Sequence, residues 1–187
     1  MTIIKEKTKL LTADDLLRLY SEGVRGELIR GVFCETMSAG EEHGEIVLNL
    51  GIILGGFIKP RRLGRLVGSD TGVRLERSPD TVREPDIAFI SAEKRPRGIR
   101  NTGYVEVIPD LVVEVVSPND RLVEVNDKSL MWLNYGVPLV WVVYPDTRTV
   151  EVHLLDGPVV TLGEEDTLDG GAVLPGFTCP VGDIFDL

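Results

Sequence analysis

The clearest helical pattern in the chain lies between residues 42 and 59. Apolar residues recur there three and four positions apart, as on one face of a helix: Ile46, Val47, Leu50, Ile53, Leu54 and Phe57. Gly51 and Gly55 lie four positions apart, so another element could approach that side of the helix closely. Pro60 follows, and because proline disrupts a helix interior, it predicts the end of the helix.

Two continuous apolar runs, 111–116 and 139–143, predict strands that are covered on both faces, since a strand with one solvated face would alternate. Between them, Asn119 or Asp120 can cap a helix that runs to Tyr135. A strand, a helix and a second strand in this order favour parallel pairing through a right-handed crossover. This unit is therefore expected at the centre of the sheet.

The rest of the pattern predicts one short helix and several short strands. Thr12 suits an N-cap, and Asp14 and Asp15 suit the first turn of a helix that ends near Gly23. Strands are expected at residues 27–29, 32–34, 65–67, 72–75, 85–90, 149–155 and 158–162, with 174–177 as a last strand or cover. Strands come both before and after the helices. This order predicts an α/β fold with a mixed sheet flanked by helices and with extra C-terminal strands.

Composition supports one folded domain over residues 1–187. The chain is 43% hydrophobic, with a mean hydropathy of +0.07, which is ordinary for a globular protein. No apolar run reaches the roughly 20 residues needed to cross a bilayer, and the first ten residues lack the apolar run of a signal peptide, so we expect no membrane association. Cys34 and Cys179 are far apart and lack metal-ligand spacing, which favours reduced thiols and a cytoplasmic location.

The charge of the chain is unevenly distributed. Its net charge of −10 counts against a protein that coats nucleic acid non-specifically. The basic residues nevertheless gather in two segments: Lys59, Arg61, Arg62 and Arg65, then Lys94, Arg95, Arg97 and Arg100. Such segments form either a basic surface on an acidic protein or solvated loops, and the sequence leaves both open.

Two carboxylates stand out against their apolar surroundings. Glu114 interrupts the apolar run 111–116, where burying an unpaired carboxylate would be costly. Asp86 begins another predicted strand directly after Pro85. Carboxylate oxygens from neighbouring strands are ligands that suit Mg²⁺ or Mn²⁺. A metal held in this way activates water and stabilises charge on phosphate, so Asp86 and Glu114 predict a divalent-metal site.

Lys128 is the third candidate for this site. It lies on the helix predicted after the Glu114 strand, from which its ammonium group could reach both carboxylates. There it could orient the attacking water or stabilise charge on the phosphate. The alternatives are a surface lysine on an exposed helix face and a lysine that forms only a buried ion pair with Glu114.

The order Pro85-Asp86, Glu114, Lys128 resembles the PD-(D/E)xK nuclease signature, with the lysine moved from the position of Val116 to the following helix. More specifically, the chain resembles the Uma2 family of restriction endonuclease-like proteins. The segments that carry this resemblance are 25–31, His43, 85–87, 111–118, Lys128, 136–138, Trp141 and 174–177. They span nearly the whole chain. Trp132, Val140 and Tyr144 depart from the family pattern, in which tyrosine, tyrosine and aspartate are expected.

The resemblance implies a restriction endonuclease-like core and a metal-dependent endonuclease, with DNA as substrate. It makes Asp86, Glu114 and Lys128 the catalytic residues and adds Glu27 to Asp86 and Glu114 as a metal ligand. Glu27 could instead pair with Arg25 or Arg30. His43 could contact a metal, a phosphate or a backbone carbonyl.

A second hypothesis is a catalytically silent protein that keeps the nuclease fold and acts as a binding or assembly module. The acidic balance favours it, because a nuclease must hold a polyanion. In either case the apolar C-terminal strands could pair across a two-fold axis, so we expect a homodimer. The residues alone do not decide between the enzyme and the silent module.

Overall fold

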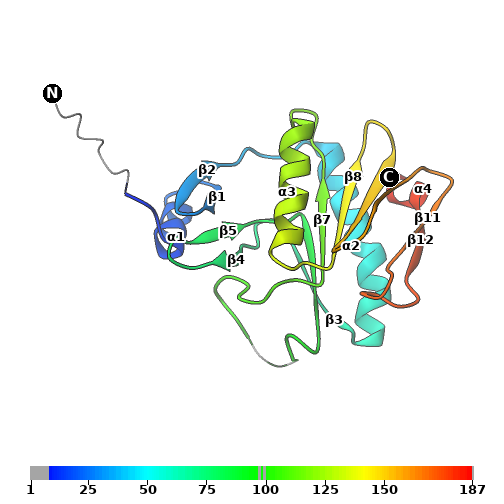
Figure 1. Ribbon diagram of the computed structural model, residues 1–187, viewed down its shortest axis with the longest axis horizontal. Coiled ribbons are helices and arrows are strands. Elements are labelled where there is room, and N and C mark those ends of the chain that lie inside the picture. Colours follow the sequence, from blue (N-terminus) through cyan, green and yellow to red (C-terminus); the bar gives the residue numbers. More distant parts are fainter. Residues whose placement is uncertain (1–8, 97, 99, 187) are drawn as a thin grey trace.

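A six-stranded mixed sheet forms the centre of the structure (Figure 1). The computed structural model describes residues 9–96, 98 and 100–186. The strands, in spatial order, are β10 (Val159–Leu162), β9 (Thr149–Leu154), β8 (Leu139–Tyr144), β7 (Leu111–Val115), β6 (Ile87–Ser91) and β3 (Gly64–Gly68). β7 and β8 pair in parallel, and the other neighbours pair antiparallel. The predicted mixed sheet and its parallel centre are confirmed.

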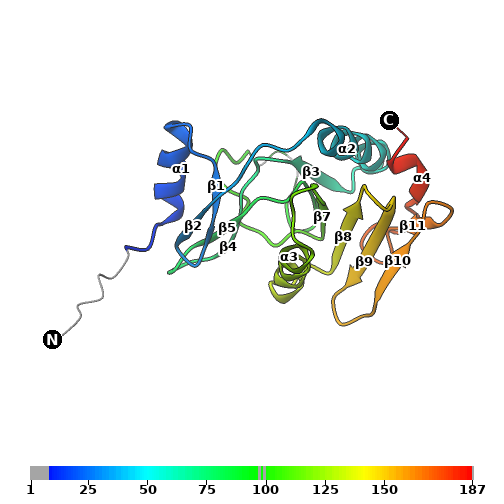
Figure 2. The same cartoon turned by 90° about the horizontal axis from the view of Figure 1, so that it is seen from above.

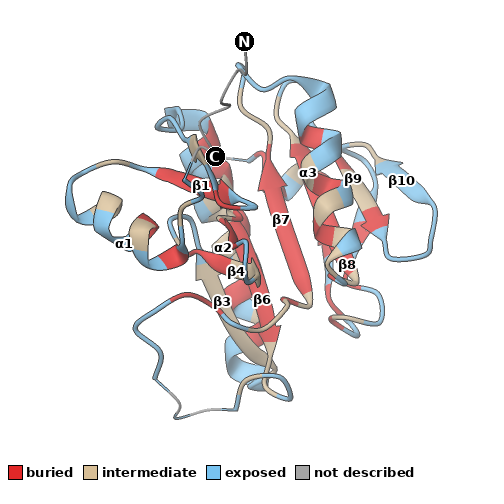
Figure 3. Cartoon of the chain, turned by 60° about the vertical axis from the view of Figure 1, so that its left-hand side comes forward, coloured by how far each residue is buried: buried red, intermediate tan, exposed pale blue. Residues whose placement is uncertain are grey.

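One long helix covers each face of this sheet. Figure 2 shows α2 (Glu41–Arg61) on one side and α3 (Leu122–Asn134) on the other. Side chains of β7 and β8 alternate between the two cores: Val113 and Trp141 pack with α2, whereas Val112 packs with Trp132 of α3. Every residue of β7 is buried (Figure 3). This two-sided burial explains the continuous apolar runs.

A second sheet lies beside the first and was not predicted as a separate unit. Its strands, in order, are β2 (Val32–Glu35), β1 (Gly26–Ile29), β5 (Thr81–Arg83) and β4 (Val73–Glu76). α1 (Ala13–Ser21) packs on it through Leu16, which is buried with Leu28 and Val82. β5 has only three residues, so it left no periodic pattern in the sequence.

The C-terminal segment closes the α2 side of the core. β11 (Thr167–Asp169) and β12 (Thr178–Pro180) form a small hairpin, and α4 (Val181–Ile184) follows. Leu174 and Phe177 are buried, and the Phe177 ring stacks on Trp141 with 5.8 Å between ring centroids. Residues 174–177 are therefore a cover rather than a strand. Within the described part of the chain, no helix is long and apolar enough to cross a membrane.

Helix ends test the capping predictions. Thr12 caps α1 in a reciprocal capping box with Asp15, as its sequence position suggested. Pro60 does not end α2; it lies in the last turn, where one lost hydrogen bond is tolerated. The helix ends at Arg61, and Arg62 follows it in a left-handed conformation. Neither Asn119 nor Asp120 caps α3. Asp120 instead accepts the backbone N–H of Ser117, 2.8 Å away, within the preceding turn.

Candidate active site

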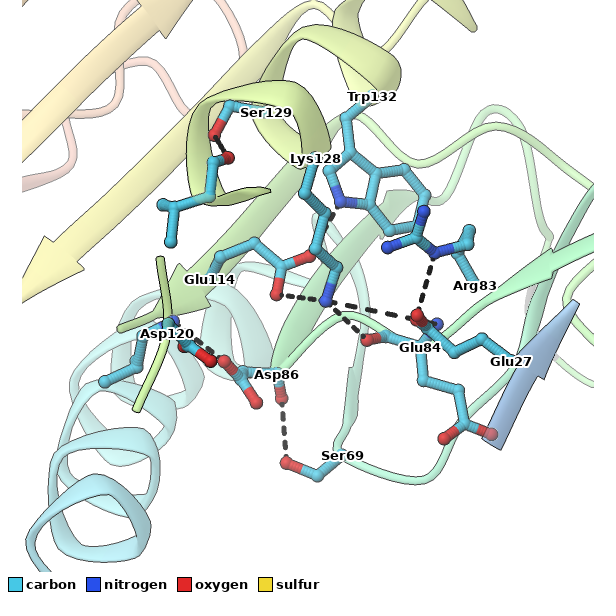
Figure 4. Close-up of polar contacts among 12 residues, drawn as sticks. Glu27, Ser69, Arg83, Glu84, Asp86, Glu114, Asp120, Lys128, Ser129 and Trp132 are labelled. Atoms are coloured by element: carbon cyan, nitrogen blue, oxygen red, sulfur yellow. Dashed lines mark hydrogen bonds and ion pairs between the residues drawn. The ribbon is translucent and has the colours of Figure 1, made fainter. Parts of the chain in front are cut away.

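Glu114 is held by two side chains of α3 (Figure 4). It lies on β7 and points to the α3 side, where it is only 7% exposed. The Trp132 indole N–H donates to its Oε1 over 2.7 Å, and the Lys128 ammonium donates to its Oε2 over 2.8 Å. Lys128 and Trp132 are four residues apart and therefore share one face of the helix. The buried carboxylate thus has a partner on each oxygen, as burial requires.

The surroundings of Glu114 oppose its ionisation. Loss of water on burial raises the pKa of Glu114 to about 7, and Lys128 and Trp132 offset this only in part. Burial also disfavours the Lys128 ammonium, but the nearby carboxylates of Glu114 and Glu27 prevail and raise the pKa of Lys128 above its ordinary value. Lys128 therefore keeps its positive charge at neutral pH.

Asp86 meets β7 just outside the β6 ladder. Ile87 pairs with Val113, so continuing this antiparallel register by one residue places Asp86 opposite Glu114 and next to Val115. The Val115 N–H donates to Asp86 Oδ2 over 2.7 Å. Burial raises the pKa of Asp86, and this hydrogen bond partly opposes the shift. The two predicted carboxylates therefore come from neighbouring strands, as expected.

His43 completes this group from the first turn of α2. Its Nε2 lies 3.2 Å from Asp86 Oδ2 and 3.1 Å from the carbonyl oxygen of Val115. Both neighbours are acceptors, so Nε2 carries the ring proton in this arrangement. Burial lowers the pKa of His43, which favours the neutral imidazole. Of the contacts considered from the sequence, the backbone carbonyl is the one that the structure shows, together with Asp86.

Glu27 pairs with neither Arg25 nor Arg30. Its Oε2 lies 2.9 Å from Arg83 Nε, across the β1–β5 pair, and its Oε1 accepts the backbone N–H of Glu84 over 2.6 Å. Lys128 Nζ is 3.9 Å from the same Oε1. Burial works against the charged form, but Lys128 and Arg83 lower the pKa of Glu27 overall. Glu27 therefore lies on the Lys128 side of the site, and its role as a metal ligand stays a prediction.

Except for Trp132, these side chains line one groove of about 1630 Å³. This volume exceeds the roughly 300–1,000 Å³ of ordinary small-molecule pockets. Carboxylates dominate its charged lining: Glu27, Glu35, Asp70, Glu84, Asp86, Glu114, Asp120 and Glu124, against Lys59, Arg83 and Lys128. A polyanion that enters this groove needs cations to screen the carboxylates.

The donor groups around Asp86 suit a divalent cation. The Asp86 carboxylate, the Val115 carbonyl and the His43 imidazole face one another within hydrogen-bond distance. Oxygen donors suit Mg²⁺ and Mn²⁺, and imidazole suits transition metals. In the described residues, however, no three side chains of His, Cys, Asp or Glu are grouped closely enough to hold a metal. Two of the three possible ligands are side chains, Asp86 and His43, and the third is the backbone carbonyl of Val115.

Three contributors were not found from the sequence: the Val115 carbonyl, Arg83 and Trp132. The Val115 carbonyl directly follows Glu114, so its position at the site was implicit in the strand prediction. Arg83 lies on the short strand β5, and only the second sheet brings it to Glu27. Trp132 had been noted only as a departure from a family pattern, although its spacing of four from Lys128 already placed both on one helix face.

The fold and this site define a restriction endonuclease-like α/β protein. The structure superposes on the crystal structure of a putative nuclease belonging to DUF820 from Anabaena variabilis, with a TM-score of 0.78 and 20% sequence identity. The similarity covers 94% of this chain and 97% of that one. At this identity the likeness shows the shared fold.

The family follows from the sequence. The profile of the Uma2 family, described as "Putative restriction endonuclease", matches residues 13–182. The chain belongs to the Uma2 family. No curated protein matches it. That residues 1–187 form a single domain stays a prediction.

Proposed function

We propose that this protein is a divalent-metal-dependent endonuclease that hydrolyses phosphodiester bonds, with DNA as the substrate. The observation that carries the proposal is the meeting of Asp86, Glu114 and Lys128 in one groove, in a chain of the Uma2 family. The three residues come from the start of β6, from β7 and from α3. A lysine held against a buried carboxylate beside a second carboxylate gives the charge arrangement that phosphodiester hydrolysis uses.

The cation would be Mg²⁺ or Mn²⁺. Asp86 would hold it with the Val115 carbonyl and Glu114, and Glu27 is the further predicted ligand. His43 would join them through the tautomer in which Nε2 has lost its proton to Nδ1. Asp86 Oδ1 accepts no hydrogen bond within the described part of the chain and is free to bind. Such an ion supplies a more acidic water and neutralises charge on the phosphate.

The protein's own groups would position the reactants. The Lys128 ammonium keeps its proton because Glu114 and Glu27 stabilise the charge, so it can donate hydrogen bonds to a water or a phosphate oxygen. Trp132 holds the other oxygen of Glu114 and limits rotation of that carboxylate. Hydrolysis forms a bond between the water oxygen and phosphorus and breaks the bond between phosphorus and the departing sugar oxygen. The proton that the water loses is balanced by the proton that the sugar oxygen gains.

Cleavage by carboxylate variants tests the proposal. Asp86→Ala and Glu114→Ala are expected to abolish Mg²⁺-dependent cleavage of plasmid DNA, while circular dichroism shows a folded protein. Glu165→Ala removes an exposed carboxylate outside the groove and is the matched control. It is expected to cleave like the wild type. Equal cleavage by all four proteins would overturn the proposal.

The silent nuclease fold remains the second candidate, favoured by the occupied oxygens of Glu114. Both are taken by Lys128 and Trp132, so binding a cation there requires a rearrangement. Calorimetric titration with Mg²⁺ and with Mn²⁺ separates the two functions. Heat of binding that disappears in Asp86→Ala supports the enzyme. If neither Mg²⁺ nor Mn²⁺ binds at millimolar concentration, the result supports the catalytically silent binding or assembly module.

We also infer a homodimer. β10 is an edge strand of the central sheet, and it exposes Val159 and Val160 on its opposite faces. An exposed apolar edge strand tends to pair with another strand. Light scattering after size exclusion should give the mass of two chains, and Val160→Lys should shift it towards one. A monomeric wild type would contradict the inference.

A further inference from the structure

Five cations at the end of α2, at the start of β3 and after β6 form no ion pair within the described residues, and one of them, Lys59, lines the groove. Among the described residues, most other arginines and lysines form ion pairs with carboxylates, including Arg74, Arg77, Arg83, Lys94, Lys128 and Arg148. Eight of the described arginines and lysines form none, and five of these lie at the end of α2, at the start of β3 and after β6: Lys59, Arg61, Arg62, Arg65 and Arg95, here called the basic cluster. The chain carries a net charge of −10, so this lack of partners does not reflect a shortage of carboxylates.

The fold gathers the basic cluster from two separate sequence segments. Gly64 pairs with Ser91 at the end of the β3–β6 ladder, which places the α2–β3 turn beside the segment that follows β6. Arg65 Nη2 donates to the carbonyl oxygen of Pro96 over 3.0 Å and joins the two. Residues 56–69 and 94–105 contain no Asp or Glu. Arg97 also belongs to the second segment in sequence but lies outside the described residues.

The groove connects the basic cluster to the candidate active site. Lys59 lines the same groove as Asp86. On α2, a row of residues spaced by four runs from His43, which touches Asp86, to Lys59 at the other end. Sixteen residues of helix correspond to about 24 Å. That length matches about seven nucleotide steps of a DNA strand.

Where α2 lines the groove, four of its residues are glycines and place no side chain there. A Cβ on Gly44 or Gly56 would meet no atom within 4 Å, and one on Gly51 or Gly55 would make only ordinary contacts at 3.9 Å. Glycine in a helix interior is less favourable than alanine because it loses more backbone freedom on folding. Packing within the described chain does not require these four glycines. Their absence of side chains leaves the helix backbone open to a ligand in the groove.

We propose that the basic cluster binds the phosphates of a DNA strand that follows this groove, about one-half to one helical turn from the scissile bond. The inference rests on the proposed function and names where its substrate is held. The carboxylates at the site end repel phosphates, so the attractive charge for the flanking DNA lies at the Lys59 end. The basic cluster and the DNA strand are complementary in charge, because the protein presents unpaired cations and the strand carries a regular row of phosphate anions.

A triple substitution tests the basic cluster. Lys59→Gln, Arg62→Gln and Arg65→Gln together remove three charges at similar side-chain length. Arg61 is left in place because its guanidinium lies 4.1 Å from the centroid of the Phe57 ring. The matched control carries Lys9→Gln, Arg18→Gln and Arg77→Gln, which remove the same total charge at exposed positions outside the groove.

Fluorescence anisotropy with labelled single-stranded and duplex DNA, in EDTA, measures binding without cleavage. The cluster variant should lose about 10- to 100-fold in affinity at 0.1 M salt, and its slope of log affinity against log salt should fall by up to about 3. The control should stay within about twofold of the wild type, since bulk charge alone has little effect on a local contact. Equal affinities of the two triple variants, or no binding by the wild type, would overturn the inference.

These outcomes are separable from the failure of the proposed function. If the protein binds DNA through the basic cluster but never cleaves it, the proposed endonuclease function is wrong and the proposed DNA-binding surface stands. If Asp86→Ala loses cleavage while the cluster variant binds DNA as tightly as the wild type, the endonuclease function stands and the proposed DNA-binding surface is wrong.

Discussion

The indole N–H of Trp132 donates to Oε1 of Glu114 over 2.7 Å, and the Trp132 side chain is fully buried. Removing a donor from a buried carboxylate leaves its oxygen without a partner. Trp132→Phe should therefore lower the free energy of unfolding by about 1–3 kcal/mol beyond the loss of ring volume. Urea denaturation measures the change.

Trp141 provides the control for this prediction. It is equally buried, and its Nε1 has no hydrogen-bond partner among the described residues. Trp141→Phe removes a similar volume without breaking a hydrogen bond. If both variants lose the same stability, the bond from Trp132 to Glu114 contributes nothing measurable.

The contact between Lys128 and Glu114 predicts strong coupling. Lys128→Met leaves Glu114 buried opposite an apolar side chain and should cost about 3 kcal/mol, the low end for a buried pair because 25% of the Lys128 side chain is exposed. The double variant Lys128→Met with Glu114→Gln should regain most of that loss. Additive losses in the double-mutant cycle would show that the two groups are not coupled.

Asp80 predicts a pH-dependent contribution to stability. Its Oδ2 accepts the N–H of Ala13 at the start of α1 over 2.7 Å, and its Oδ1 accepts from Arg74 over 2.8 Å. Burial acts against the charged form, but these hydrogen bonds and Arg74 prevail and lower the pKa of Asp80. A lowered pKa stabilises the fold above the pKa of the unfolded chain, and this contribution is lost as the pH falls through the folded-state value.

Asp80→Asn should therefore lower the free energy of unfolding at pH 7 by about 1–3 kcal/mol. The difference from the wild type should shrink as the pH falls below about 4, where the unfolded carboxyl group takes up a proton. Thermal unfolding at several pH values measures both. A difference that stays constant down to pH 2 would contradict the assignment.

Gly56 predicts a stabilising substitution. A Cβ there meets nothing within 4 Å, so Gly56→Ala should raise the free energy of unfolding by about 0.5–1 kcal/mol through helix propensity. If DNA follows the groove, the same variant should bind it more weakly. Gly64→Ala is the contrast, because its Cβ would lie 2.1 Å from the Ile90 carbonyl oxygen, and it should destabilise the protein. If Gly56→Ala lowered the free energy of unfolding instead, the added methyl group would have to clash with another part of the protein, contrary to the prediction.

Much of the fold was accessible from local pattern because the central elements have strong periodicity. The helix of residues 42–59, the strand-helix-strand unit around Glu114 and the strands predicted at 149–155 and 158–162 all appear in the structure with small shifts at their ends. The second sheet was not recognised, because β5 has three residues and its pairing with β1 joins segments more than fifty residues apart. Such pairing leaves no signal in a local window.

For the candidate site, residue type and position were enough to select Asp86, Glu114 and Lys128, because a carboxylate in an apolar run needs a partner and a helix that follows its strand can supply one. Which atoms meet was decided by tertiary structure. The β6–β7 register placed Asp86 opposite Glu114 and next to Val115, and the first turn of α2 brought His43 to Asp86 and to the Val115 carbonyl. The β1–β5 pair gave Glu27 the partner Arg83 instead of Arg25 or Arg30. Contacts between distant segments depend on register and packing, and these are set only when the whole chain folds.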